Sequence, residues 1–139
     1  MRFIVTLILI YLSSALYGQT YYSQSSSDPD ILNNWNTNRS GGGSAPSTFL
    51  GSNDVFVIQN GHTMTSTNDA GGRTTSGWNI GGSSSTLQSE GGGVLIANYE
   101  VDLGSTATFQ IDNEGSYIHN YASDEIFDGT ESFAAGSTF

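Results

Sequence analysis

Four carboxylates in one stretch of the sequence are spaced so that they could place oxygen atoms close together. Glu100 and Asp102 alternate with apolar residues, Asp112 follows the next apolar pair, and Glu114 stands in the turn after it. Calcium binds about six to eight oxygen ligands, so stacked strands carrying these residues would make a calcium site. The competing interpretation is a solvated acidic face, because the stretch has neither an EF-hand loop nor a glycine–aspartate nonapeptide repeat.

The same carboxylates are of the type that sugar-cleaving enzymes use. A glycosidase needs an acid and a base, and a polysaccharide lyase combines a base with calcium. Both require a defined separation between the two groups, which the sequence does not supply. We therefore assign no catalytic residue, and calcium is the only cofactor under consideration.

The two histidines, His62 and His119, carry little sign of metal chemistry. The chain has no cysteine and no His-x-x-x-His spacing, so a zinc site is not indicated. His62 follows the pair Asn60-Gly61, and we expect it to close a corner by hydrogen bonding. The serines lack a Gly-x-Ser-x-Gly motif with a suitable histidine and acid, and the glycines at 91–93 lack the lysine of a phosphate loop.

Aromatic side chains are the usual platforms for sugar rings. Trp78 shares strand parity with Ile80, and Tyr99 with Val101, so we expect Trp78 and Tyr99 to point inward. Three other tyrosines are freer to be exposed: Tyr21, Tyr22 and Tyr121. The sequence identifies no aromatic platform among them.

Charge and composition narrow the class of protein. The 139 residues include three Lys plus Arg against 13 Asp plus Glu, a formal net charge of −10. Such a chain repels phosphate backbones and anionic lipid surfaces, so nucleic acid is not an expected partner. The 36% hydrophobic and 12% aromatic content indicates a packed core rather than disorder, in one domain or part of one.

The first 18 residues predict a secretory signal. Arg2 precedes a ten-residue apolar run at 3–12, and small residues follow at 13–18. Cleavage after Ala15 and cleavage after Gly18 both satisfy the small-residue preference. No later run is long enough to span a bilayer, and without cysteine neither disulfides nor a lipidated N-terminal cysteine can form. We expect a secreted, extracellular protein.

Beyond the signal, the sequence alternates with the period of β-strands. Val101 and Leu103 alternate with acidic residues, and Phe109 and Ile111 with polar ones. Val101 and Phe109 are eight residues apart, as are Phe109 and Tyr117, with turn formers between them. Short strands at constant spacing are typical of an antiparallel sandwich or of a solenoid.

The stretch DVFVIQNGHTMT at 54–65 favours the solenoid. A hairpin at Asn60-Gly61 would scatter the apolar residues over both faces, although this pair is a strong hairpin signal. A corner at the same place turns Phe56, Ile58 and Met64 inward and leaves the threonines in water. We predict an all-β chain folded as a parallel β-solenoid in the form of a right-handed β-helix, with a β-sandwich as the alternative.

The predicted organisation has three parts. After the signal at 1–18, residues 19–50 form an N-terminal segment and cap, in which 30–35 make one helical turn and Trp35 covers the core. Residues 51–139 form the stacked strands. Aromatics recur at Phe127, Phe133 and Phe139 without a closing cap, so we expect an unprotected edge and a longer protein of which this is the N-terminal part.

Several short motifs resemble the start of large bacterial surface proteins. They are TYYS (20–23), LNNWNTN (32–38), SAPSTF (44–49), DVFVIQNGHTMT (54–65) and GTESFAAGSTF (129–139). Proteins of this kind resemble products of the type IX secretion route, which carry β-solenoid regions followed by a C-terminal sorting domain. Residues 35–65 are also similar to an extracellular eight-glycine domain thought to contact carbohydrate.

Two functional classes follow. The first is a secreted structural or adhesive module that displays loops at the bacterial cell surface and contacts polysaccharide or other surface components. The alternative is the N-terminal part of a carbohydrate-active β-helix enzyme, a polysaccharide lyase or a glycosidase. The fold alone does not separate them.

Overall fold

The computed structural model describes residues 17–67, 78–120 and 129–139. Most of the predicted signal segment lies outside these ranges, as do Tyr121 and Phe127. The described residues form an all-β structure with a single 3-10 turn, η1 (Leu32–Asn34). None of their helical structure is long and apolar enough to cross a membrane.

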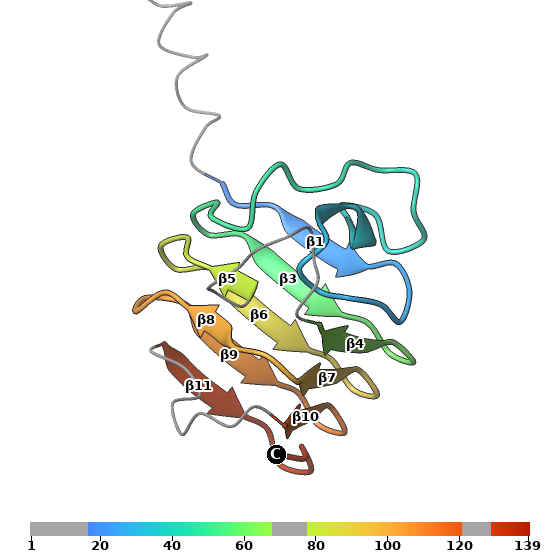
Figure 1. The fold of residues 1–139 in the computed structure, drawn as a ribbon, viewed down its shortest axis with the longest axis vertical. Helices are drawn as coiled ribbons and strands as arrows, with labels where there is room; N and C mark the ends of the chain where they lie inside the picture. The colour runs from blue at the N-terminus through green and yellow to red at the C-terminus, as the bar shows by residue number, and fades with distance from the viewer. Residues whose placement is uncertain (1–16, 68–77, 121–128) are drawn as a thin grey trace, which may run out of the picture.

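The strands are grouped in three sheets (Figure 1). Sheet A has the order β11-β9-β6-β3-β1-β2, sheet B the order β10-β7-β4, and sheet C the order β5-β8. The strands are β1 (Thr20–Ser23), β2 (Trp35–Asn36), β3 (Val55–Ile58), β4 (Thr63–Ser66), β5 (Trp78–Ile80), β6 (Thr86–Ser89), β7 (Val94–Ala97), β8 (Val101–Leu103), β9 (Thr108–Ile111), β10 (Ser116–His119) and β11 (Thr130–Phe133).

Nearly all strand pairs in the described residues are parallel, and they repeat at a fixed step. Thr86 of β6 pairs with Thr108 of β9, 22 residues later, and Trp78 of β5 pairs with Val101 of β8, 23 residues later. The exception is the antiparallel pairing of β1 with β2. Parallel strands need crossover connections, and here each crossover passes through the other two sheets.

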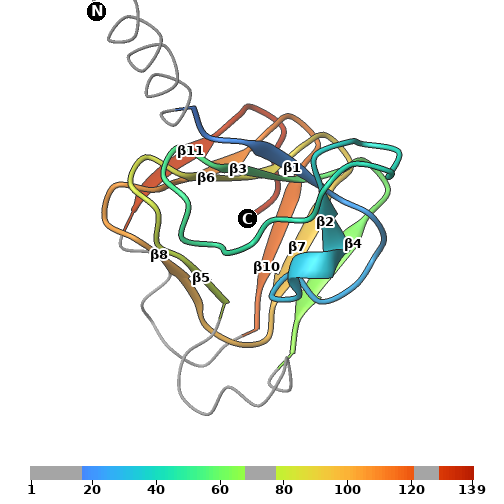
Figure 2. The same cartoon turned by 90° about the horizontal axis from the view of Figure 1, so that it is seen from above.

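The pair Asn60-Gly61 is a corner, as predicted, and not a hairpin. It joins β3 of sheet A to β4 of sheet B, which do not pair with each other. Gly61 has a φ of 78°, a conformation that glycine adopts without strain. The eight-residue spacing of the sequence is therefore the distance from one sheet to the next, as seen from above in Figure 2.

The inward side chains of the three sheets form one hydrophobic core. Phe56, Ile58 and Met64 are fully buried, as the sequence predicted. Residues in register stack in columns, so each circuit of the chain buries the apolar surface of the one before it. The columns are Tyr21, Phe56, Leu87 and Phe109 in sheet A, Met64, Leu95 and Tyr117 in sheet B, and Trp78 with Val101 in sheet C.

The N-terminal end of this core is closed by a cap. Trp35, at the end of the predicted turn, is completely buried and stacks on Trp78 with 5.7 Å between ring centroids. Its Nε1 donates to the carbonyl oxygen of Pro29 at 2.8 Å. Phe49, from the loop before β3, packs edge-on against Trp78. The prediction that Trp35 covers the core is confirmed.

The C-terminal end is open by comparison. β11 is the last strand of sheet A, and all four of its residues are exposed. Phe133 and Phe139 are 43% and 57% exposed, with their ring centroids 4.9 Å apart. Glu131 takes the place in register below the buried Phe109. The described residues thus leave apolar surface uncovered at this end.

Candidate functional site

His62 closes a corner, as predicted, by joining β1 to the turn after β3. Its Nδ1 lies 2.8 Å from the Oγ of Ser23, and that Oγ also accepts a hydrogen bond from the backbone N–H of Gln59 at 3.0 Å. The serine hydroxyl must therefore donate to His62. Because Ser23 is completely buried, the pair is a structural link and not a nucleophile with its base.

His119 forms a comparable pair with Tyr117 at the open end. The Nδ1 of His119 lies 2.8 Å from the hydroxyl of Tyr117. Burial, with a smaller contribution from the charge of Glu131, raises the pKa of Tyr117 to about 12. The phenol therefore stays protonated at any physiological pH and serves as a hydrogen-bonding group.

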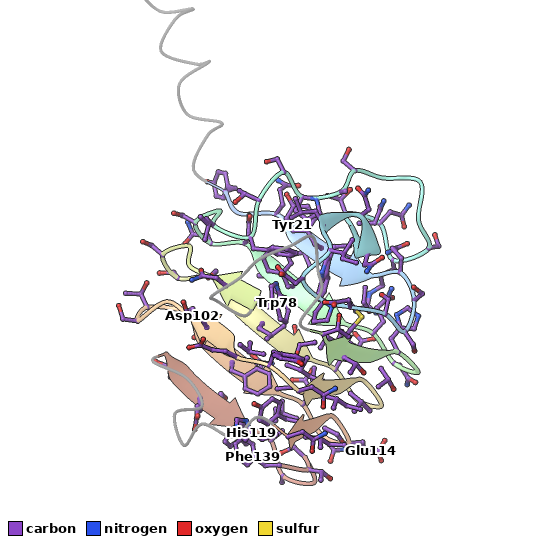
Figure 3. The ribbon with its side chains drawn as sticks, viewed as in Figure 1. Tyr21, Trp78, Asp102, Glu114, His119 and Phe139 are labelled. Atoms are coloured by element: carbon purple, nitrogen blue, oxygen red, sulfur yellow. The ribbon has the colours of Figure 1, made fainter. Side chains whose placement is uncertain are left out.

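The four calcium candidates lie at separate places. The side chain of Asp102 on β8 accepts a hydrogen bond from Asn79, while Asp112 accepts from Gln88 and Gln110, each at 2.7 Å. Glu100 and Glu114 are exposed, and Figure 3 shows Asp102 and Glu114 on opposite sides of the molecule. Residues 17–67, 78–120 and 129–139 contain no group of three or more potential metal ligands. Calcium binding stays a prediction.

Two of the aromatic predictions are wrong. Tyr21 was expected at the surface but is only 9% exposed, because β1 joins sheet A and its ring stacks 5.3 Å from Phe56. Tyr99 was expected in the core but is 36% exposed, because β8 begins only at Val101 and strand parity does not reach it. Trp78 is 1% exposed, which confirms its inward position.

An ion pair that the sequence did not indicate ties the cap to sheet A. The guanidinium of Arg39 makes two hydrogen bonds to Glu90, at 2.6 and 2.9 Å, and lies 4.5 Å above the ring of Tyr22. The hydrogen bond from Arg39 holds the pKa of Glu90 below its ordinary value, against the effect of burial. Arg39 and Glu90 are 51 residues apart, and no local pattern relates them.

A cavity of about 290 Å³ lies beside the cap, next to the first strand of sheet C. In sheet A, β1 pairs with β3 on its N-terminal side, whereas β5 has no such strand in sheet C. The loop at 47–50 occupies that position. The cavity is lined by Leu32, Ser47, Thr48, Phe49, Leu50 and Asn79, none of which is charged.

Asn79 places an unsatisfied acceptor next to this cavity. Its Nδ2 donates to the carboxylate of Asp102, which accepts only. That bond fixes the amide so that Oδ1 faces the other way, where it is buried without a hydrogen-bond partner. An unpaired buried acceptor costs about 1–3 kcal/mol. The Nε1 of the neighbouring Trp78 is buried and unpaired as well.

No model of a protein family, no curated protein and no solved structure matches this chain.

Proposed function

We propose that the protein is a secreted scaffold, folded as a right-handed parallel β-solenoid, which displays loops at the bacterial cell surface and contacts extracellular polysaccharide. The 22-residue pairing step and the rotation of the chain through three parallel sheets support this fold over a sandwich. Seen from the N-terminal end in Figure 2, the chain runs clockwise from β3 to β4 to β5 as it recedes. That sense agrees with the rule for parallel crossovers.

The observation that carries the binding proposal is an uncharged outer face on sheet A. The outward residues of its parallel strands lie in two registered columns. One column is Thr20, Val55, Thr86, Thr108 and Thr130, and the other is Tyr22, Val57, Gln88, Gln110 and Ser132. Neighbouring strands are about 4.8 Å apart. A chain with 13 acidic residues thus presents a regular face of hydroxyl, amide and methyl groups without a charge in either column.

Such a face suits a neutral, extended polymer rich in hydroxyl groups. Threonine offers a methyl group for the apolar side of a sugar ring and a hydroxyl that both donates and accepts hydrogen bonds. The side chains are held in place by the sheet, so little conformational entropy is lost on binding. Anionic polymers are disfavoured by the net charge of −10.

Binding to insoluble polysaccharides tests the proposal. We expect the purified chain to sediment with a neutral polysaccharide, and the double variant T86E/T108E to bind at least about tenfold more weakly because charges now interrupt the face. The matched control, T63E/S116E, places the same charges on the outer side of sheet B and should bind normally. If neither charge pair changes binding, the face is not the site. Release of new sugar ends by the chain would instead support the enzyme alternative.

Secretion is tested separately. Residues 1–18 fused to a cytoplasmic reporter should direct it across the inner membrane of a bacterial host, whereas replacing apolar residues at 3–12 with charged ones should keep it inside. A reporter that stays inside with the unmodified segment would contradict the secreted assignment.

A further inference from the structure

We propose that the cavity between the cap loop and β5 is a separate binding site for one neutral sugar unit. It shares its ligand class with the proposed function but uses other residues, at the end of the stack rather than on its side. The argument rests on the size of the cavity, on the chemistry of its lining and on the unpaired acceptor of Asn79.

The size suits a single small ring. At about 290 Å³ the cavity is at the lower limit of small-molecule sites, which span about 300–1,000 Å³. It is many times larger than the roughly 30 Å³ that one water molecule occupies in the liquid. A long polymer would have to enter by its end or by a branch, whereas a monosaccharide unit fills the space.

The lining combines apolar and hydroxyl groups. Leu32, Phe49 and Leu50 offer apolar surface to the C–H side of a sugar ring. Ser47 and Thr48 add two hydroxyls, and the Oγ1 of Thr48 already accepts from the backbone N–H of Leu50 at 3.1 Å, so its proton remains for a ligand oxygen.

Asn79 supplies the polar contact that the protein itself leaves unmade. Its amide is oriented by Asp102, and its Oδ1 faces Gly81 and Leu50, since a Cβ added at Gly81 would lie 2.7 Å from that oxygen and 2.9 Å from Leu50 Cδ2. A sugar hydroxyl donating to Oδ1 would satisfy it. Because no lining residue is charged, a carboxylated sugar would find no counter-ion.

The test is a titration of the purified chain with methyl glycosides of neutral hexoses and with glucuronic acid, followed by NMR. We expect saturable shifts of the Asn79 side-chain amide and of the Leu50 methyls with a neutral glycoside and not with the acid. L50A should weaken binding about fivefold by removing apolar contact, and G81A should abolish it by filling the space. The matched control I118A truncates an equally accessible apolar residue on β10 and should leave affinity within about twofold.

The outcomes separate this site from the proposed function. Loss of glycoside binding in G81A with polysaccharide sedimentation retained supports the cavity and leaves the sheet A face intact. Polymer binding without any shift at Asn79 or Leu50 overturns the cavity site while the scaffold proposal stands. Preference for glucuronic acid, or equal weakening by L50A and I118A, also overturns it. Folding of each variant is checked by the dispersion of its amide spectrum, and T48V, a change at an exposed position, provides a second cavity variant if G81A does not fold.

Discussion

The two ends of the stack are built in opposite ways. At the N-terminal end, Trp35 is fully buried against Trp78 and Phe56, and an ion pair fastens the loop that carries Arg39. At the C-terminal end of the described residues, β11 is wholly exposed, and the rings of Phe133 and Phe139 are about half exposed. The core is therefore sealed on one side and continues to the surface on the other.

This difference shows what a stacked array requires of its ends. An inner circuit buries apolar side chains by contact with neighbours on both sides, whereas an end circuit has one neighbour only. The N-terminal end meets this need with aromatic rings from a non-repeating segment. The C-terminal end has Glu131 in the column of buried residues, and an inward-pointing charge is one of the devices that blunt a sheet edge.

The largest expected effect comes from removing the cap. Trp35→Ala deletes a buried ring that stacks on two others, so it should lower the free energy of unfolding by about 3–5 kcal/mol, as measured by denaturant titration. The matched change at the open end, Phe139→Ala, removes a ring that is 57% exposed and should cost less than about 1 kcal/mol. Equal losses would show that the two ends contribute alike and would remove the contrast between them.

The second prediction concerns association through the exposed strand. The outer edge of β11 has unpaired backbone groups that another strand can join, so the chain should self-associate with rising concentration in sedimentation velocity. Ser132→Lys places a charge on that edge and should weaken association at least about tenfold. Ser44→Lys, in the cap loop, is the control and should change little. A chain that stays monomeric at all concentrations would mean that Glu131 already protects the edge.

The smallest expected effect is at the Arg39–Glu90 pair, whose side chains are 52% and 17% exposed. Arg39→Ala should lower the free energy of unfolding by about 0.3–1 kcal/mol at neutral pH. The pKa of Glu90 is depressed from its ordinary 4.5, so the pair stabilises the fold above that pH and loses its effect as pH falls through the folded-state value.

Urea titrations at several pH values test this dependence. The difference between Arg39→Ala and the unaltered chain should vanish at strongly acidic pH, and Glu90→Gln should behave alike. A difference that persists after Glu90 is protonated would assign the effect to the contact of Arg39 with Tyr22 instead.

The strands and their buried faces were predictable because both are written locally. Alternation with period two placed Phe56, Ile58 and Met64 inward, and the apolar scatter of a hairpin argued for a corner at Asn60-Gly61. The same rule failed for Tyr99, which precedes its strand, and for Tyr21, whose position near the N-terminus did not reveal that it pairs with β3.

The candidate site was not predictable to the same degree. The sequence proposed carboxylates, whereas the cavity is lined by uncharged residues from η1, the loop at 47–50 and β5. Asn79 looks like any outward strand residue, and only its bond to Asp102, 23 residues away, turns its oxygen toward the cavity. A missing strand above β5 has no local signal, because it depends on where a loop of another circuit settles.

The sequence by itself determined which segments become strands, which residues of each strand are buried and where the chain turns, since these follow from the period of two and from the backbone freedom of residues such as Gly61. Only the tertiary structure decided which strands stack, since partners lie 22 to 35 residues apart and are chosen by fitting whole circuits together. The cap, the exposed edge and the cavity all arise at that level, where side chains from distant segments compete for the same space.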